Sequence, residues 1–294
     1  MVVLIKKSSK FRRKSNPKLD HSESIAQKSF QSYLSESLHR LLADQKHGSN
    51  SLSLSWFIPC FKFLQGMNRA FAKLVKDLNY PISKWKGNFA EEYLSYTLNM
   101  LDALNSISSS ISHVGISRLT LTHAISLISN SPSSAIQHLK PIIPRKVKVE
   151  NPKNKGVGSF NCDEEKVIHE AMMKMKGINL LILRVLVSGL SEVNGDLSWL
   201  NSAELEGFDL NFSDSLVVKE IEEVNEAVKR IKDGLVEEQL SSKNELVAEE
   251  LKKKLGEIEN LMEMVNKEVN CLFSEVLARR SELIDCLRLP KSSS

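Results

Sequence analysis

Few residues of this 294-residue chain stand in a spacing that could do chemistry. His169 and Glu170 begin like the helical zinc motif of metalloproteases, in which two histidines one helical turn apart bind the metal together. Met173 stands where the second histidine is required. Because a single imidazole cannot form that site, the sequence predicts no metal here.

Other reactive side chains are better explained by structure or solvation. Lys155–Ser159 has two of the glycines of a dinucleotide-binding loop but no convincing strand before it, so we expect a linker. His113 and His123 are ten residues apart, which places them on different faces of a helix. The paired carboxylates Glu222–Glu223 and Glu249–Glu250 lie in highly charged stretches, where we expect solvation. No catalytic, cofactor-binding or metal-binding residue is predicted, and we expect no enzyme.

The composition is that of an ordinary globular protein. Hydrophobic residues make up 41% and charged residues 26%, and the 12 Gly and 8 Pro are few for this length, which disfavours an all-β fold. The cysteines are too widely spaced for a metal knuckle or a compact disulfide framework, so we expect free thiols in a reducing compartment. They are Cys60, Cys162, Cys271 and Cys286.

A basic arm at the start of the chain has the most direct functional interpretation. Residues 1–18 hold seven basic residues and no acid, and removing them changes the net charge from +4 to −3. Within the arm, Arg12, Ser15 and Pro17 match the phosphoserine motif that 14-3-3 proteins read. A phosphate on Ser15 would offer its oxygens to an arginine cluster of the reader.

The same arm has other interpretations. Its charge could bind an anionic lipid surface, or it could be a solvated, disordered tail. It is also basic, serine-containing and acid-poor, as an organellar transit peptide is. Nucleic-acid binding is disfavoured, because Phe11 is the arm's single stacking aromatic. The candidate lipid contacts are Lys6, Lys7, Lys10, Arg13 and Lys14.

Apolar residues recur at helical spacing along the rest of the chain. We expect helices over about 22–45, 52–78, 88–128, 135–139 and 163–189, and two more near the end. The first should bury Ile25, Phe30, Leu34, Leu38 and Leu41. The third carries Met100, Leu104, Ile107, Ile111, Val114, Leu121, Ile125 and Ile128, with Arg118 at the skipped position.

The last two helices have the clearest seams, with alternating steps of four and three residues. The seams are Val217, Ile221, Val224, Val228 and Ile231, and then Leu251, Leu255, Ile258, Met262, Val265, Val269, Leu272 and Val276. Such stripes require partner helices, because a lone apolar stripe would stay exposed. The predicted fold is all-α, an elongated multi-helix bundle with coiled-coil-like packing.

One helical domain should follow the arm. We expect a disordered arm over residues 1–20, a single helical domain over 21–289 and a tail over 290–294. The domain should have two helical halves, 21–140 and 162–289, which a basic linker over 141–161 joins. Residues 190–212 should be a structured connection around Trp199.

The most apolar run, residues 178–190, contains Arg184 and is shorter than the roughly 20 residues of a membrane span. Apolar residues precede the positive ones at the start, the reverse of a secretory signal, so we expect a cytoplasmic protein, with membrane association or plastid targeting as alternatives.

Three stretches carry a family resemblance. They are Leu54-Ser55-Trp56 with Asp77-Leu78, Pro81, Ser83 and Trp85; Tyr93-Leu94 with Leu101-Asp102 and Asn105; and Lys267-Glu268-Val269 with Cys271, Phe273, Arg280, Leu283 and Leu287-Arg288. In this order and spacing they resemble the plant BYPASS-like family, which is related to the ROH-type proteins. The similarity extends, with gaps, over most of residues 30–288.

The resemblance implies a regulator of plant development. Family members restrain a mobile root-derived signal that can arrest shoot growth, and some relatives are linked to exocyst subunits or to 14-3-3 proteins. No catalytic residue carries over, and Trp56, Trp85 and Leu101 coincide with expected packing positions. We therefore expect a non-enzymatic adaptor that binds proteins. The alternatives are a peripheral membrane protein in exocyst-linked trafficking and an enzyme acting on a small, for instance carotenoid-derived, metabolite, for which the sequence indicates no polar pocket.

The longest seam generates the first testable prediction. Val265→Asp should unfold the protein or nearly so, because an unpaired charge in a helix interface is costly. Thermal unfolding followed by circular dichroism measures this, and a folded variant with an unchanged Tm would contradict the assignment of this seam.

Overall fold

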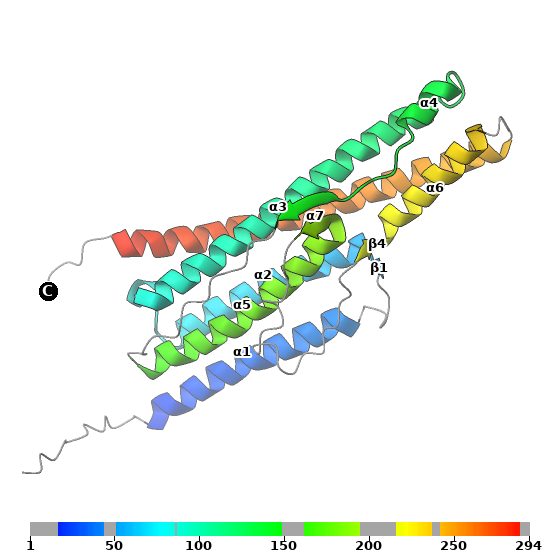
Figure 1. The fold of residues 1–294 in the computed structure, drawn as a ribbon. Coiled ribbons are helices and arrows are strands. Elements are labelled where there is room, and N and C mark those ends of the chain that lie inside the picture. The colour runs from blue at the N-terminus through cyan, green and yellow to red at the C-terminus, as the bar shows by residue number, and fades with distance from the viewer. Residues whose placement is uncertain are drawn as a thin grey trace, which may run out of the picture.

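A computed structural model describes residues 17–43, 51–85, 87–148, 162–194, 216–236 and 242–288. Within these ranges the chain forms seven α-helices packed into an elongated bundle, as Figure 1 shows. This confirms the all-α prediction. Coiled-coil-like packing stays a prediction.

The helices lie close to the predicted ranges. In chain order they are α1 (Pro17–Ala43), α2 (Leu54–Asp77), α3 (Gly87–Leu127), α4 (Pro132–His138), α5 (Asp163–Leu190), α6 (Lys219–Val236) and α7 (Ser242–Arg288), with a short 3-10 helix, η1 (Ile82–Lys84), before α3. At 1.5 Å per residue, α3 and α7 are about 60 and 70 Å long. Their length sets the long dimension of the bundle (Figure 1).

Local sequence explains where several helices begin. The Ser53 hydroxyl accepts a hydrogen bond from the backbone N–H of Ser55 at the start of α2. At the start of α5, the Cys162 sulfur accepts a hydrogen bond from the backbone N–H of Glu165. The first turn of α5 also holds three acidic residues, whose negative charge is favourable at the positive end of the helix dipole. Pro132 opens α4, where its fixed φ suits a helix and its missing N–H costs nothing.

The α7 seam is the centre of the packing. All eight predicted seam residues are buried, and Val265 is fully so. They pack α7 against α2, α3 and α6. In α3 the seam is interrupted at Arg118, whose guanidinium pairs with Glu259 of α7 at 2.6 Å. The position that the apolar seam of α3 skips therefore carries an ion pair between the two longest helices.

Two seam residues were assigned wrongly. Ile25 is exposed, because the step of five residues to Phe30 turns it about 140° away from the buried face, and Ala26 packs there instead. Val217 is exposed because it lies in a strand before α6, where the helical period does not apply, and its neighbour Val218 is buried. The helix α1 also begins at Pro17, so residues 17–20 of the expected arm are helical.

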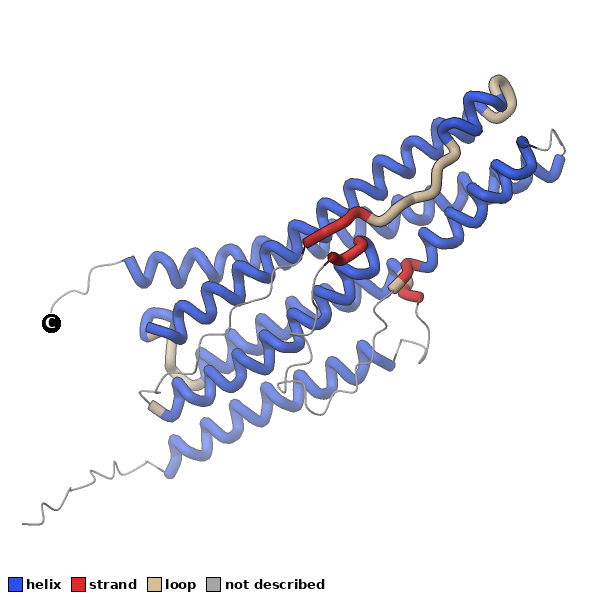
Figure 2. The backbone as a smooth tube through the Cα atoms, in the orientation of Figure 1, coloured by secondary structure: helices blue, strands red, loops and turns tan. Residues whose placement is uncertain are grey.

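Short strands that the sequence pattern does not indicate join distant segments. In chain order they are β1 (Ser51–Leu52), β2 (Arg145–Lys148), β3 (Ser191–Asn194) and β4 (Val217–Val218). β1 pairs with β4 and β2 with β3, both in parallel (Figure 2). Runs of two to four residues are too short to show a period of two. β2 occupies part of the expected linker, while Lys155–Ser159 and Trp199 lie outside the described ranges.

The tryptophans of the described ranges are core residues, as expected. Trp56 and Trp85 are buried, and so is Leu101. The indole N–H of Trp56 donates to the carbonyl of Leu41 at 3.2 Å and so ties α2 to α1.

Two glycines test how tightly the helices pack. A Cβ at Gly189 of α5 would stand 3.2 Å from Phe57 and 3.3 Å from Leu52, both enclosed by the core, so Gly189→Ala should destabilise the fold by about 1–3 kcal/mol. Gly256 in α7 meets nothing within 4 Å, and Gly256→Ala should stabilise by about 0.5–1 kcal/mol. Urea unfolding of both variants measures this; an equal gain in both would contradict the close approach at Gly189.

Candidate functional site

The residues predicted to bind partners are outside the described structure. This holds for Arg12 and Ser15 of the phosphoserine motif and for the five candidate lipid contacts Lys6, Lys7, Lys10, Arg13 and Lys14. Pro17, the last residue of the motif, is the first residue of α1. The motif therefore ends where the helical bundle begins.

His169 belongs to an ion-pair cluster between α3 and α5. Its Nε2 lies 3.0 Å from a carboxylate oxygen of Glu92, and the Lys176 ammonium lies 3.1 Å from the other oxygen. His169 and Lys176 are seven residues apart, so two turns of α5 place both on the face toward α3. The hydrogen bond from His169, helped by Lys176, lowers the pKa of Glu92 although burial opposes this.

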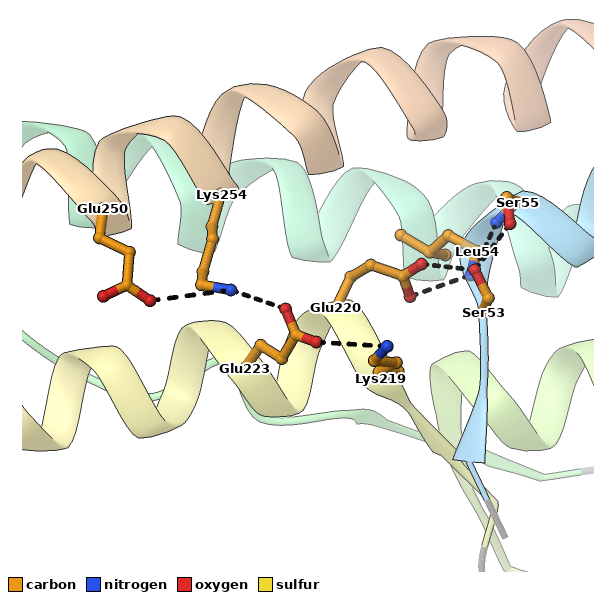
Figure 3. A network of polar contacts seen from close by, with 8 residues as sticks. All are labelled: Ser53, Leu54, Ser55, Lys219, Glu220, Glu223, Glu250 and Lys254. Atoms are coloured by element: carbon orange, nitrogen blue, oxygen red, sulfur yellow. Dashed lines mark hydrogen bonds and ion pairs between the residues drawn. The ribbon is translucent and has the colours of Figure 1, made fainter. Parts of the chain in front are cut away.

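One carboxylate of each predicted pair joins α6 to α7, and Figure 3 shows the contact of Glu223 with Lys254. Glu223 contacts Lys254 of α7 at 2.7 Å, and Glu250 contacts Arg230 of α6 at 3.3 Å. The contact lowers the pKa of Glu223 and raises that of Lys254, mainly through their hydrogen bond. These carboxylates are partly exposed, as expected, but they also bridge the two helices.

Glu220 caps a helix that is far away in the sequence. One carboxylate oxygen accepts from the hydroxyl of Ser53 at 2.6 Å, and the other accepts from the backbone N–H of Leu54 at 3.0 Å (Figure 3). This places a negative charge at the positive end of α2. The contact fixes the start of α2 against α6, next to the β1–β4 pair.

The remaining predicted candidates also have structural partners. His113 lies 3.1 Å from the carbonyl oxygen of Ile143, and the ring of His123 packs against that of His138. The four cysteines are free, and burial raises the pKa of the Cys60 thiol well above its usual value, which keeps that thiol protonated. Over the described ranges, no group of three His, Cys, Asp or Glu residues could hold a metal ion.

A cavity of about 600 Å³ opens where α2, η1, α3, α5 and α7 meet. Its inner wall is aromatic and apolar and includes Phe71, Trp85, Tyr93, Tyr96, Met100 and Met175. Its mouth is charged and polar and includes Arg69, Lys76, Asn79, Glu275, Arg279 and Glu282. This combination of an apolar interior and a few polar groups is typical of small-molecule sites.

The aromatic residues of the wall hold one another in edge-to-face contacts. The rings of Trp85 and Tyr93 are 5.1 Å apart at 79°, and those of Phe71 and Trp85 are 6.2 Å apart at 61°. The Trp85 N–H donates to the carbonyl of Tyr80 at 3.3 Å. These contacts fix the positions of the rings relative to one another.

Burial disfavours the ionised form of both tyrosines of the wall. It raises the pKa of Tyr93 to about 12 and that of Tyr96 further still. Behind the wall, the side-chain amide of the fully buried Asn179 donates to the Tyr96 oxygen. The Asn179 amide oxygen has no hydrogen-bond partner among the described residues.

This cavity was not predicted from the sequence. Its signal was present in Trp85, Phe89, Tyr93 and Tyr96, which follow one another in steps of four, four and three residues. That spacing predicts one aromatic stripe but does not say whether the facing helices fill the space in front of it.

The fold and these contacts define a helical-bundle protein whose charged clusters join its helices. No family model matches the chain, and no solved structure matches it significantly. Among curated proteins, it is 26% identical over 298 residues to "Protein BPS1, chloroplastic" of Arabidopsis thaliana, covering 88% of this chain and 82% of that protein. It is a distant homologue of that protein, which confirms the resemblance to the BYPASS-like family.

Two rice proteins are further relatives. The chain is 24% identical over 241 residues to "UPF0496 protein 4" of Oryza sativa subsp. indica, covering 69% of this chain and 52% of that protein. It is 28% identical over 102 residues to the protein of the same name in subsp. japonica, covering 35% and 22%. The chain thus spans about half the length of the first rice protein. Among the described helices, none is both long enough and apolar enough to cross a membrane.

The Glu92 cluster generates a pH-dependent prediction. Glu92→Gln should lower the free energy of unfolding by about 1–3 kcal/mol near neutral pH, because it removes the charge that His169 and Lys176 contact. Since the pKa of Glu92 is lowered in the folded protein, its contribution is present above the ordinary pKa of a glutamate and is lost as the pH falls through the lowered value. Urea titrations at several pH values should show the difference shrinking in acid.

A matched control separates this effect from a general loss of charge. Glu249 is mostly exposed and pairs with Lys252 at 3.6 Å, so Glu249→Gln should change stability by less than about 0.5 kcal/mol at every pH. A pH-independent loss in Glu92→Gln would contradict the role of its charge.

Proposed function

We propose that this protein is a non-enzymatic regulator of plant development that acts by binding other proteins. The observation that carries the proposal is the distant homology to BPS1 over 88% of the chain. The family resemblance implies restraint of a root-derived mobile signal that controls shoot and root growth.

The contacts of the described residues support a scaffold role. The long apolar seams are buried between the helices of this chain, and the charged clusters at Glu92, Glu220 and Glu223 join pairs of helices. These side chains serve to hold a rigid bundle together. A rigid bundle with charged outer faces suits an adaptor that presents surfaces to partners.

The basic arm is our candidate for regulated partner binding. With Arg12 three residues before Ser15 and Pro17 two after it, a phosphorylated Ser15 would suit a 14-3-3 protein. Because Pro17 already belongs to α1, the reader would bind close to the bundle. Exocyst subunits are the second class of partner that the resemblance suggests.

A second candidate role for the arm is plastid targeting. It is favoured by the name of the Arabidopsis relative, which calls that protein chloroplastic, and by the basic, acid-poor composition of residues 1–18. A third role, in which Lys6, Lys7, Lys10, Arg13 and Lys14 hold the protein on anionic membranes, follows from charge alone.

Proximity labelling in plant cells tests the proposal. The intact protein should enrich 14-3-3 proteins or exocyst subunits, and Ser15→Ala should reduce the 14-3-3 signal at least several-fold, because it removes the phosphate acceptor. Ser8→Ala is the matched control, since neither Arg nor Pro stands in the corresponding positions around Ser8.

Two other outcomes of the labelling experiment would contradict parts of the proposal. Plastid neighbours that are lost on deletion of residues 1–16 would replace the adaptor proposal with the targeting role. Enrichment of 14-3-3 proteins that Ser15→Ala leaves unchanged would contradict the role of the motif.

A further inference from the structure

The cavity between α2, α3 and α7 is not used by the proposed function. We propose that it binds a small amphipathic molecule with a planar apolar body and one anionic group, such as a carboxylate. Four features of the site support this assignment: its size, its wall, the hydroxyls on the wall and the charges at its mouth.

The size and the wall suit a planar apolar body. About 600 Å³ lies in the ordinary range of small-molecule pockets, roughly 300–1,000 Å³. Trp85 and Tyr96 are almost fully buried and are fixed by their neighbours, so only a small, preformed part of each ring borders the cavity. A flat ligand ring can meet such ring edges edge-to-face.

The tyrosine hydroxyls of the wall differ in what they offer a ligand. The Tyr96 hydroxyl is held by the Asn179 amide behind the wall. Among the described residues, none forms a hydrogen bond with the Tyr93 hydroxyl, whose pKa burial raises to about 12. An oxygen atom on the ligand would accept a hydrogen bond from Tyr93.

The charges at the mouth favour an anion. Arg69 is paired with Glu275 at 2.6 Å, and Arg279 with Glu282 at 3.3 Å. Lys76 makes no ion pair within the described ranges, so the mouth has one cation more than it has anions. An anionic group on the ligand would pair with Lys76 and neutralise this excess charge, while the apolar body of the ligand lies inside the cavity.

The charged mouth also argues against a protein segment as the occupant. A partner helix would bring an extended apolar face, and that face would have to cover two exposed ion pairs. A molecule that enters end-on leaves both pairs in water.

Naphthoate and its uncharged analogue naphthamide are suitable probes. We expect isothermal titration of the purified chain to show naphthoate binding about tenfold more tightly than naphthamide, because Lys76 contributes one charge-assisted contact. Lys76→Gln should remove this difference and leave naphthamide binding unchanged. Lys73→Gln is the control, since Lys73 is exposed on the same helix but does not line the cavity.

Two variants test whether binding occurs in the cavity. Ala72→Trp from α2 and Ala278→Trp from α7 each place a large side chain into it from opposite walls. Both should abolish binding of either probe while circular dichroism reports an intact fold, and either one suffices if the other does not fold.

The results separate the parts of the inference. No binding of either probe, or binding that survives a filled cavity, would overturn the site. Equal affinity for both probes, or no effect of Lys76→Gln, would overturn the anionic ligand class. Neither result depends on the 14-3-3 motif, which lies outside the cavity, so the failure of one proposal leaves the other standing.

Discussion

The apolar seam of α7 is the contact on which the bundle depends. Its eight residues are buried against three other helices, α2, α3 and α6, so one stripe links elements from both ends of the chain. Burial of an aliphatic side chain is worth about 1.5–3 kcal/mol relative to exposure, so eight such residues contribute strongly to holding α7 in the bundle. Because α3 and α7 are the two longest helices, their contact also sets the length of the molecule (Figure 1).

Polar contacts then fix how the helices are placed along one another. Two helices that contact each other through apolar stripes can shift along one another at little cost. An ion pair or a helix cap forms only when the helices are in one relative position. Arg118 with Glu259 joins α3 to α7, the Glu92 cluster joins α3 to α5, and Glu220 joins α6 to the start of α2. The residue types that first suggested chemistry serve here to position helices.

The same constraint produces the cavity. Long helices that are fixed at their seams cannot close every gap between them, and where η1 and the first turns of α3 pass α7, the side chains leave about 600 Å³ open. Aromatic residues line this space and charged residues surround its mouth. A binding site can therefore arise at a helix junction without a dedicated motif in the sequence.

The sequence alone determined the helices, their seams and the core tryptophans, because the period of 3.6 residues is a local property that eight successive positions display. It also carried the resemblance to the BYPASS-like family. Tertiary structure decided what spacing does not encode: the exposure of Ile25 and Val217, the parallel pairing of four short strands, the cluster of Glu92 with His169 and Lys176, and the cavity in front of Tyr96. Each of these depends on which residues from distant segments face one another, and that follows only from how the helices pack.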